Sequence, residues 1–233
     1  MELKPNEGKN CIIEVDGQRY ERLPIHTHLI TEADDIVDVA QQYGAPVLSQ
    51  PGDVLFITEK IVACTQGRAI PLKDIKPRKL AYWLSDKVTK TPHGIGLGMP
   101  ETMEYALREV GALRILFAAA VSVIGKKIFR KKGWFYAVAG YKARSIDGPC
   151  HNTIPPYNQC VVLGPLNPDQ VAKDIKARLG YDVLIADIND LEGQILGASS
   201  KDLDKKLYAR ILKDNPLGQD RQQTPMGIIR KLA

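Results

Sequence analysis

Residues 181–193 read YDVLIADINDLEG, and this stretch decides the fold class. Val183 to Ala186 form a short apolar run, the pattern of a β-strand that is buried on both faces. The run stops at Asp187, and Asn189 and Asp190 follow within three residues. In α/β proteins, a buried strand that ends in carboxylates places charge at the carboxyl edge of a sheet, where ligands bind. The stretch therefore indicates an α/β fold with a polar site at that edge.

The polar residues of this stretch allow two interpretations. Carboxylate and amide oxygens are the ligands that Mg²⁺ and Mn²⁺ prefer, so Asp187, Asn189 and Asp190 can contribute to a metal site. Asp and Asn are also the residues that form tight turns, and an ordinary loop would use them in the same way. The stretch alone leaves both interpretations open.

Outward from this strand, the pattern alternates between helices and strands. A helix precedes it: Asn167 can cap the helix, Pro168 suits the first turn and Gly180 ends it. Residues 52–57, GDVLFI, form a second buried strand. Asp16-Gly17 lies between two short apolar segments, which is a strong hairpin signal.

Further segments are assigned by the same rules. They are a helix that Thr31 caps with Asp34 in its first turn, a helical region from Asp74 to Val88, a buried helix over Leu113–Gly125, a strand over Trp134–Ala139, and an apolar terminus at Ile228-Ile229 that returns to the core. A hairpin and a long irregular segment after Gly140 interrupt the alternation, so we expect a mixed sheet with flanking helices rather than a purely doubly wound one. Residues 1–233 then form one domain, which can divide into two intimate lobes with the metal and nucleotide site between them.

The composition is that of an ordinary soluble globular protein, with 44% hydrophobic and 25% charged residues. A net charge of +5 and a pI near 8.9 suit a phosphate-bearing ligand but are too weak to argue for nucleic acid. The four cysteines show no paired short spacing, so we expect reduced thiols and a cytoplasmic protein. The polar start is not a signal peptide, and the most apolar stretch is too short to span a bilayer, so no membrane partner is expected.

Residues 93–103, HGIGLGMPETM, form the most loop-like glycine cluster. Gly94 and Gly96 leave backbone N–H groups unobstructed, and the helix that starts near Pro100 favours an anion at its amino end. No Gly-Lys-Ser/Thr follows, which excludes a P-loop. The alternative is a plain flexible connection.

The basic residues of 126–132 predict either a solvated turn or a turn that faces a phosphate.

Six motifs occur in a characteristic order from about His28 to Arg230. They are HLITEADDI, GDVLFITEKIVACTQGR, GWFYAVAG, LGPLNPDQVAKDI, DVLIADIND and LGQDRQQTPMGIIR. With them, the chain resembles a divergent short member of the coenzyme F-420-0:L-glutamate (gamma-glutamyl) ligase family. The resemblance implies the gamma-glutamyl ligase fold and an intertwined homodimer. It also implies addition of glutamate to a carboxylate-bearing substrate through an acyl phosphate, with GTP and a divalent metal.

The resemblance also implies roles for individual residues. The family's nucleotide-binding segment corresponds to His28, Leu29, Ile30 and Thr31, and a further nucleotide contact corresponds to Gln219. Its metal-binding aspartate at the strand end corresponds to Asp187.

Three positions differ from the family pattern. Cys64 stands where the family has a lysine, Lys142 where it has a metal-binding aspartate, and Ile188 where it has a threonine. We expect oxygens of Asp147, Asn189 and Asp190 to complete the metal site, because a metal needs oxygens rather than a particular residue order.

Lys142 can supply positive charge, which makes Lys142 and Asp147 the candidate catalytic residues. The candidate cofactor-binding residues also include Glu59 and Lys60, which directly follow the second strand, and the glycines Gly94 and Gly96.

The sequence thus predicts a ligase that uses GTP or ATP with Mg²⁺ or Mn²⁺ and joins glutamate to a polyanionic, carboxylate-bearing cofactor such as a deazaflavin or a folate-like molecule. The alternative is a non-catalytic nucleotide- or anion-binding relative on the same scaffold. RNA binding is disfavoured, because few aromatic residues are interleaved with the basic turns.

Overall fold

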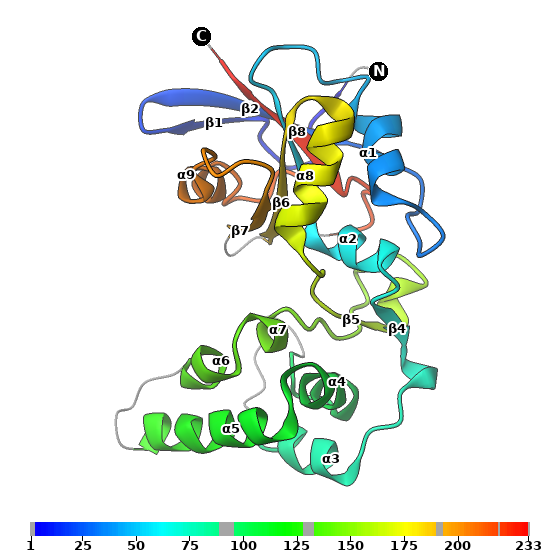
Figure 1. Cartoon of the computed structure of the whole chain (residues 1–233), viewed down its shortest axis with the longest axis vertical. Helices are drawn as coiled ribbons and strands as arrows, with labels where there is room; N and C mark the ends of the chain where they lie inside the picture. Colours follow the sequence, from blue (N-terminus) through cyan, green and yellow to red (C-terminus); the bar gives the residue numbers. More distant parts are fainter. Residues whose placement is uncertain (1–2, 89–95, 128–132, 190–192, 219, 233) are drawn as a thin grey trace. The chain divides into compact units, whose positions relative to one another are not determined.

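The structure, a computed structural model, describes residues 3–88, 96–127, 133–189, 193–218 and 220–232 (Figure 1). The chain divides into two compact units. Met1–Gly67 and Pro165–Ala233 form one, called the sheet unit here, and Arg68–Gly164 form the other, called the helical unit. Each unit is described by itself.

The sheet unit contains a six-stranded mixed sheet with the strand order β1-β2-β8-β3-β6-β7. Its strands are β1 (Ile12–Val15), β2 (Gln18–Ile25), β3 (Val54–Thr58), β6 (Asp182–Ile188), β7 (Gly193–Ala198) and β8 (Met226–Lys231). β3 and β6 are parallel, and the other neighbours are antiparallel. The predicted α/β class with a mixed sheet and flanking helices is confirmed.

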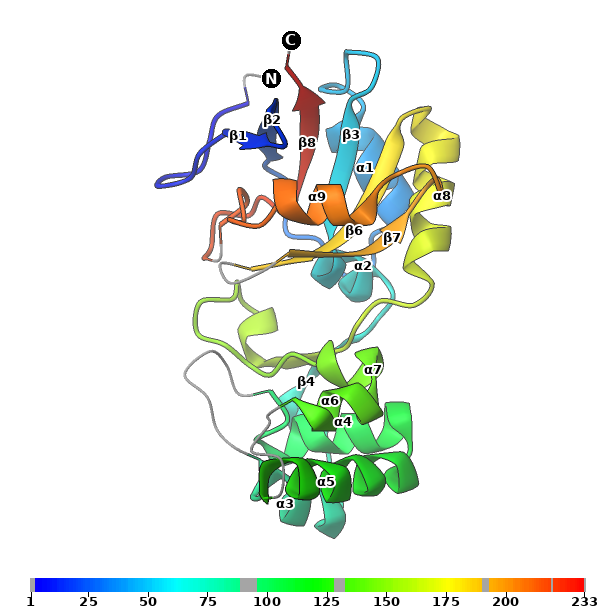
Figure 2. The same ribbon diagram turned by 90° about the vertical axis from the view of Figure 1, so that its left-hand side faces the viewer.

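Helices cover both faces of this sheet (Figures 1 and 2). They are α1 (Ile36–Gly44), α2 (Glu59–Thr65), α8 (Pro168–Leu179) and α9 (Lys205–Ile211). Leu55 and Ile57 of β3 pack in one core with α1 and α8, whereas Val54 and Phe56 pack in another with α9. Because successive strand residues point to opposite faces, β3 is buried on both sides, as its apolar run predicted.

The C-terminal strand β8 lies inside the sheet, between β2 and β3. Ile228 is paired with Leu23 on one side and with Leu55 on the other. The neighbouring Gly227 leaves no room for a side chain: a Cβ there would lie 2.6 Å from the Leu23 carbonyl oxygen and 2.7 Å from the Phe56 ring. The predicted return of the terminus to the core is confirmed.

The turns at the ends of these elements follow the predicted chemistry, with two exceptions. Asn167 occupies the N-cap position of α8, but its side chain makes no capping hydrogen bond. Asp16 and Gly17 both have positive φ, 54° and 75°, as a two-residue hairpin turn requires. Helix α1 begins later than predicted, at Ile36, and its cap is Asp35, whose carboxylate accepts hydrogen bonds from Val37 and Asp38 N–H. The prediction that Thr31 caps this helix is wrong, because residues 31–34 form a separate turn.

The helical unit packs short helices around one apolar core. Its elements are the strand pair β4 (Ala69–Pro71) and β5 (Cys160–Val162), the 3-10 turns η1 (Leu72–Asp74) and η2 (Tyr157–Gln159), and the helices α3 (Lys79–Ser85), α4 (Pro100–Val110), α5 (Ala112–Lys127), α6 (Trp134–Ala139) and α7 (Tyr141–Arg144). Glu104 is 1% exposed and accepts hydrogen bonds from the side chains of Arg78 and Arg108. Burial opposes its ionisation, but the hydrogen bonds from Arg78 outweigh it and the pKa of Glu104 lies below its ordinary value.

Three assignments in the helical unit are corrected. Trp134–Ala139 is a helix rather than a strand: Gly133 and Gly140, both with positive φ, bound one helical turn and a half, and tertiary packing overrides the strand preference of its aromatic residues. The Leu113–Gly125 stretch is helical, but it is buried on one side only: Ile115 and Ala118 are 0% exposed, whereas Leu113 is 86% and Phe117 62% exposed. The Asp74–Val88 region is only partly helical.

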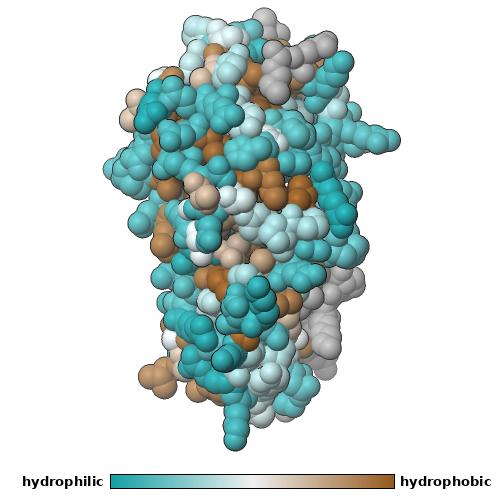
Figure 3. Space-filling view, turned by 90° about the vertical axis from the view of Figure 1, so that its right-hand side faces the viewer, coloured by the Kyte–Doolittle hydropathy of each residue, from teal (hydrophilic) through white to brown (hydrophobic). Residues whose placement is uncertain are grey.

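The face of the molecule in Figure 3 is mostly hydrophilic, and its hydrophobic side chains form small separate groups. This surface agrees with a composition in which 25% of the residues are charged.

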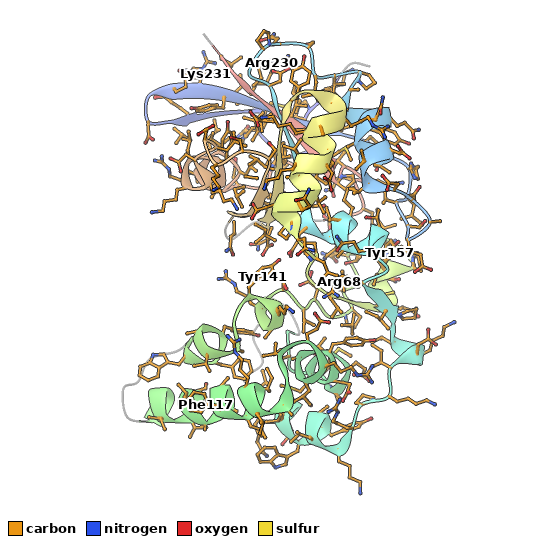
Figure 4. The ribbon with its side chains drawn as sticks, in the orientation of Figure 1. Arg68, Phe117, Tyr141, Tyr157, Arg230 and Lys231 are labelled. Carbon is orange, nitrogen blue, oxygen red and sulfur yellow. The ribbon has the colours of Figure 1, made fainter. Side chains whose placement is uncertain are left out.

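A buried ion pair fixes β8 to the loop before β3. Arg230 donates to both carboxylate oxygens of Asp53 at 2.8 and 2.7 Å, and the N–H groups of Ser49 and Gln50 donate to the same carboxylate. Asp53 is 2% exposed, and Arg230 lies near the C-terminal end of β8 (Figure 4). Burial opposes ionisation, but the hydrogen bonds from Arg230 and the two N–H groups outweigh it and lower the pKa of Asp53.

Replacing this carboxylate by an amide, Asp53→Asn, is expected to lower the free energy of unfolding at neutral pH by about 3 kcal/mol, because it leaves the largely buried Arg230 charge with only Glu21, 4.0 Å away, as a counter-ion. Since the pKa of Asp53 is depressed, the stabilisation is present above the ordinary aspartate pKa and is lost as the pH falls through the folded-state value. Urea unfolding of both proteins at neutral and acidic pH measures the difference. The difference in unfolding free energy between Asp53→Asn and the parent should shrink on acidification, whereas Glu14→Gln, at an exposed site on β1, should match the parent. A difference that is independent of pH would show that the ionised Asp53 carboxylate is not its cause.

Candidate functional site

Four strand ends meet at one edge of the sheet in the sheet unit. A row of paired residues crosses the sheet from Ile25 through Met226 and Ile57 to Ile185. Beyond this row β2, β3 and β6 reach their carboxyl ends and β8 has its start. The carboxyl ends of the parallel pair β3 and β6 are the place where α/β proteins bind ligands.

Several of the predicted site residues lie at this edge. His28–Thr31 follows the end of β2, and Glu59 and Lys60 begin α2 directly after β3. Thr58 is paired with Ala186, so Glu59, the first residue of α2, and Asp187 of β6 directly follow a pair of residues on two adjacent parallel strands. Asn189 follows the last residue of β6, and both Asp187 and Asn189 are half-buried. Residues that are distant in the sequence are therefore brought to one edge.

The segment before β8 closes the same edge. The Thr58 N–H donates to the Pro225 carbonyl oxygen at 3.0 Å, and the Thr27 N–H donates to the Gln223 carbonyl oxygen at 3.1 Å. These bonds hold the start of β8 against the residues that leave β2 and β3.

The His28–Thr31 segment is held in place by Asp34 and Tyr43. One carboxylate oxygen of Asp34 accepts from the Thr31 N–H at 2.7 Å and from the Thr31 hydroxyl at 3.0 Å. The His28 ring lies between the other oxygen of Asp34, 3.0 Å from Nε2, and the Tyr43 hydroxyl, 2.8 Å from Nδ1. The hydrogen bond from the Thr31 N–H is the main cause that lowers the pKa of Asp34, so its carboxylate stays ionised.

Sequence analysis did not identify Asp34 and Tyr43 as site residues. The Thr-x-x-Asp spacing from Thr31 to Asp34 resembles a helix cap, and for that reason the sequence predicts it at the start of the helix. In the structure the same spacing closes a turn outside α1. The residues of the His28–Thr31 segment also differ in burial. The Ile30 side chain is buried in the core, so only the backbone of this residue can face a ligand.

The F420-0:Gamma-glutamyl ligase family model matches residues 24–196, which is more than half of the chain. This chain belongs to that family. The match includes the segment after β2, the start of α2 and the end of β6, and it stops before the C-terminal motif. A search of curated proteins found no match. Among the described residues, no helix of this ligase-family protein is long and apolar enough to cross a membrane.

The positions that the sequence analysis expects to differ from the family pattern, and the candidate Asp147, lie in different surroundings. Cys64 is buried in α2. Ile188, the last residue of β6, packs against the core beside α9. Lys142 is exposed on α7 of the helical unit. Asp147 forms a backbone bridge with Val162 of β5, with nitrogen-to-oxygen distances of 2.8 and 3.0 Å. Lys142 and Asp147 thus belong to the helical unit, and their predicted roles stay predictions.

The structure describes only part of the glycine cluster in which an anion site is predicted. Gly96 adopts a positive φ of 49° shortly before α4, where Pro100 occupies the first turn as predicted. Gly94 lies outside the described residues, and so do Gln219 and Asp190. Anion binding at Gly94 and Gly96, and nucleotide binding at Gln219, stay predictions.

A metal centre would draw its donors from the end of β6. Asp187 offers a carboxylate and Asn189 an amide oxygen, and both are ligands that hard cations accept. In the part of the chain that the structure describes, no group of three or more His, Cys, Asp or Glu residues could hold a metal ion. The predicted set of Asp187, Asn189, Asp190 and Asp147 therefore stays a prediction.

Removing the Asp34 carboxylate should loosen the segment after β2. Asp34→Ala deletes the acceptor for the Thr31 N–H, the Thr31 hydroxyl and the His28 ring, so the Thr31 amide should exchange with solvent about tenfold faster. Hydrogen exchange read by mass spectrometry on peptides spanning residues 26–34 tests this. Glu32→Gln, at an exposed neighbour, is the matched control and should leave exchange unchanged. Equal protection in Asp34→Ala and the parent would show that other contacts hold the segment.

Proposed function

We propose that this member of the ligase family uses a nucleoside triphosphate and a divalent metal to form an amide bond between glutamate and a carboxylate of a cofactor-like acceptor. The observation that carries the proposal is the meeting of His28–Thr31, Glu59 with Lys60, and Asp187 with Asn189 at one sheet edge, inside the range that matches the family. The acceptor is a polyanion such as a deazaflavin or a folate-like molecule, and the nucleotide is GTP or ATP.

The reaction class sets what each group must do. Transfer of the γ-phosphoryl group to the acceptor carboxylate gives an acyl phosphate, and attack by the amine of glutamate forms the amide and releases phosphate. Most of the catalysis in such transfers is positioning and electrostatic stabilisation. The backbone of His28–Thr31 would position the nucleotide, because Asp34 and Tyr43 already hold this segment in one conformation.

The remaining residues would act on charge. Asp187 and Asn189 would hold Mg²⁺ or Mn²⁺, which when bound supplies neutralisation of the phosphate oxygens. Lys60 at the start of α2 would hold a phosphate by its ammonium group, and Glu59 beside it would orient that group. Lys142 would stabilise the transferring phosphoryl group, and Asp147 would contribute a further carboxylate oxygen to the metal site.

A second candidate function is nucleotide or anion binding without catalysis. It is favoured by the buried Cys64 at the position of a family lysine, since a thiol in the interior cannot hold a phosphate. Both candidates predict nucleotide binding, and only the first predicts a product.

Two measurements separate them. Thermal shifts with GTP and ATP, with and without Mg²⁺ or Mn²⁺, detect binding, which adds about 2.7 kcal/mol of stability at a hundredfold excess over Kd. Incubation with nucleotide, metal, glutamate and a deazaflavin or folate acceptor then tests catalysis, with mass spectrometry to detect the addition of one glutamate. Binding without product supports the second candidate, and absence of binding contradicts both.

The proposal also includes a homodimer, which sedimentation would detect, and a cytoplasmic location.

Asp187 is the residue on which the proposed metal site depends most. Asp187→Asn should abolish metal-dependent nucleotide binding, because it removes the carboxylate at the end of β6, and Asp147→Asn should weaken it. Calorimetric titration of Mn²⁺ in the presence of nucleotide is the measurement. Asp202→Asn, which changes an exposed carboxylate after β7, should leave both affinities unchanged. Unchanged binding by Asp187→Asn would remove the proposed metal site.

A further inference from the structure

The loop that precedes β8 is tied to the residues that leave β2. It is called the C-terminal loop here, and the structure describes its residues 214–218 and 220–225. The Gln223 carbonyl oxygen accepts from the Thr27 N–H at 3.1 Å, and the Thr27 hydroxyl donates to the His28 carbonyl oxygen at 2.8 Å. Thr27 is 2% exposed. The C-terminal loop is therefore linked to the His28–Thr31 segment through one buried residue.

Asn6 joins the two arms of the C-terminal loop. Its side-chain nitrogen donates to the Leu217 carbonyl oxygen and to the Thr224 hydroxyl oxygen, both at 2.8 Å. The Thr224 hydroxyl in turn donates to the Leu217 carbonyl oxygen at 2.9 Å. A side-chain amide nitrogen carries two N–H groups, and both are used in this contact. An ionised aspartate has only acceptors and could make neither bond, so the contact requires an amide.

The two arms of the loop are held in different ways. In the first arm, Asn215 is 1% exposed and closes a turn: its side chain accepts from the Leu217 N–H at 3.3 Å and donates to the Gly218 carbonyl oxygen at 3.0 Å. In the second arm, Gln223 adopts a positive φ of 57°. This conformation is uncommon for a residue with a Cβ and persists only where surrounding contacts hold it. The bonds of Thr27 and Thr224 are contacts of this kind.

The segment that carries Asn6 is itself fixed in the sheet unit. Leu3 packs against the core that contains α1 and α8 residues. Arg22 of β2 is 0% exposed, and its guanidinium donates to the Asn10 carbonyl oxygen at 2.6 Å and to the carboxylate of Asp214, where the C-terminal loop begins. Asn6 therefore approaches the loop from a segment that is already anchored on both sides.

We propose that Asn6 is a positioning residue for nucleotide binding at the sheet edge. It does not touch the nucleotide. It holds Thr224, and with it the Gln223 carbonyl oxygen, to which the Thr27 N–H is bonded. Thr27 in turn holds the His28 carbonyl oxygen. The inference rests on the proposed function, in which the backbone of His28–Thr31 positions GTP or ATP. Apparent affinity falls with the population of the binding conformation, so loss of Asn6 should raise the Kd for nucleotide.

Calorimetric titration of the whole chain with GTP and with ATP, in the presence of Mg²⁺, tests the inference. Asn6→Asp has nearly the same shape but removes both donors, so it should raise Kd about tenfold. Thr224→Val removes the hydroxyl without a change of charge and should weaken binding similarly. Thr224→Ser retains the hydroxyl and should bind as the parent does. Because both residues belong to one contact, the combined Asn6→Asp and Thr224→Val variant should lose less than the product of the single effects.

Gln18→Glu is the matched control. The Gln18 side-chain nitrogen donates to the Leu232 carbonyl oxygen at 2.6 Å and to the Arg19 carbonyl oxygen at 3.1 Å, beside the C-terminal end of β8. The substitution removes two amide donors and adds one negative charge, as Asn6→Asp does, but at the opposite end of the strand. It should leave the Kd for nucleotide unchanged.

Hydrogen exchange read by mass spectrometry separates positioning from general stability. Without nucleotide, Asn6→Asp should exchange faster than the parent in peptides spanning residues 26–31 and 220–226. Saturating nucleotide should restore the parent's protection, because the bound nucleotide selects the same conformation. Faster exchange throughout the sheet unit, β3 included, would show that Asn6 contributes only to global stability and would overturn the inference.

The titration distinguishes failure of this inference from failure of the proposed function. If the parent binds nucleotide and Asn6→Asp binds it as tightly, only the inference is overturned. If the parent binds neither GTP nor ATP, the proposed function and the inference both fall. Should Asn6→Asp not fold, Thr224→Val compared with Thr224→Ser gives the same decision: equal Kd values for these two variants would overturn the inference.

Discussion

The backbone hydrogen bonds of β8 join two parts of the sheet that would otherwise be separate. β2 and β3 are each paired with this last strand and not with one another. Without it, the β1–β2 hairpin would have an unpaired edge, and a hairpin alone is marginally stable in water. Gly227 makes the close approach of all three strands possible, and the Arg230–Asp53 pair holds the strand in register with the loop before β3. The end of the chain is therefore required for a sheet that begins near its start.

The same pairing positions the candidate site. The row from Ile25 through Met226 and Ile57 to Ile185 lies just inside the edge, so the polar residues that follow each strand emerge at the same level. The proposed chemistry depends on positioning, and this arrangement would supply it. It also explains why Asp34 and Tyr43 matter: they hold the segment after β2, which is not itself part of the sheet.

The helical unit depends on the packing of its helices around one apolar core rather than on strand pairing. Its charged core residue, Glu104, is accommodated by two arginines, and its longest helix is apolar on both the buried and the exposed side. Such a helix is held in the unit by its packed face, while its other face lies exposed. Composition cannot distinguish the two faces, since both consist of aliphatic and small residues.

The sequence by itself determined the elements whose signals are local. The apolar run of β6, the Asp16-Gly17 turn and the Pro168 and Gly180 boundaries of α8 depend on residues within a few positions of one another, and all were predicted. Tertiary structure alone decided what depends on distant partners. The residues of α6 are helical despite their strand preference, Asp34 closes a turn instead of entering a helix, and one side of α5, with Leu113 and Phe117, faces solvent instead of the core. In each case the local pattern fits two structures, and packing against residues far along the chain selects between them.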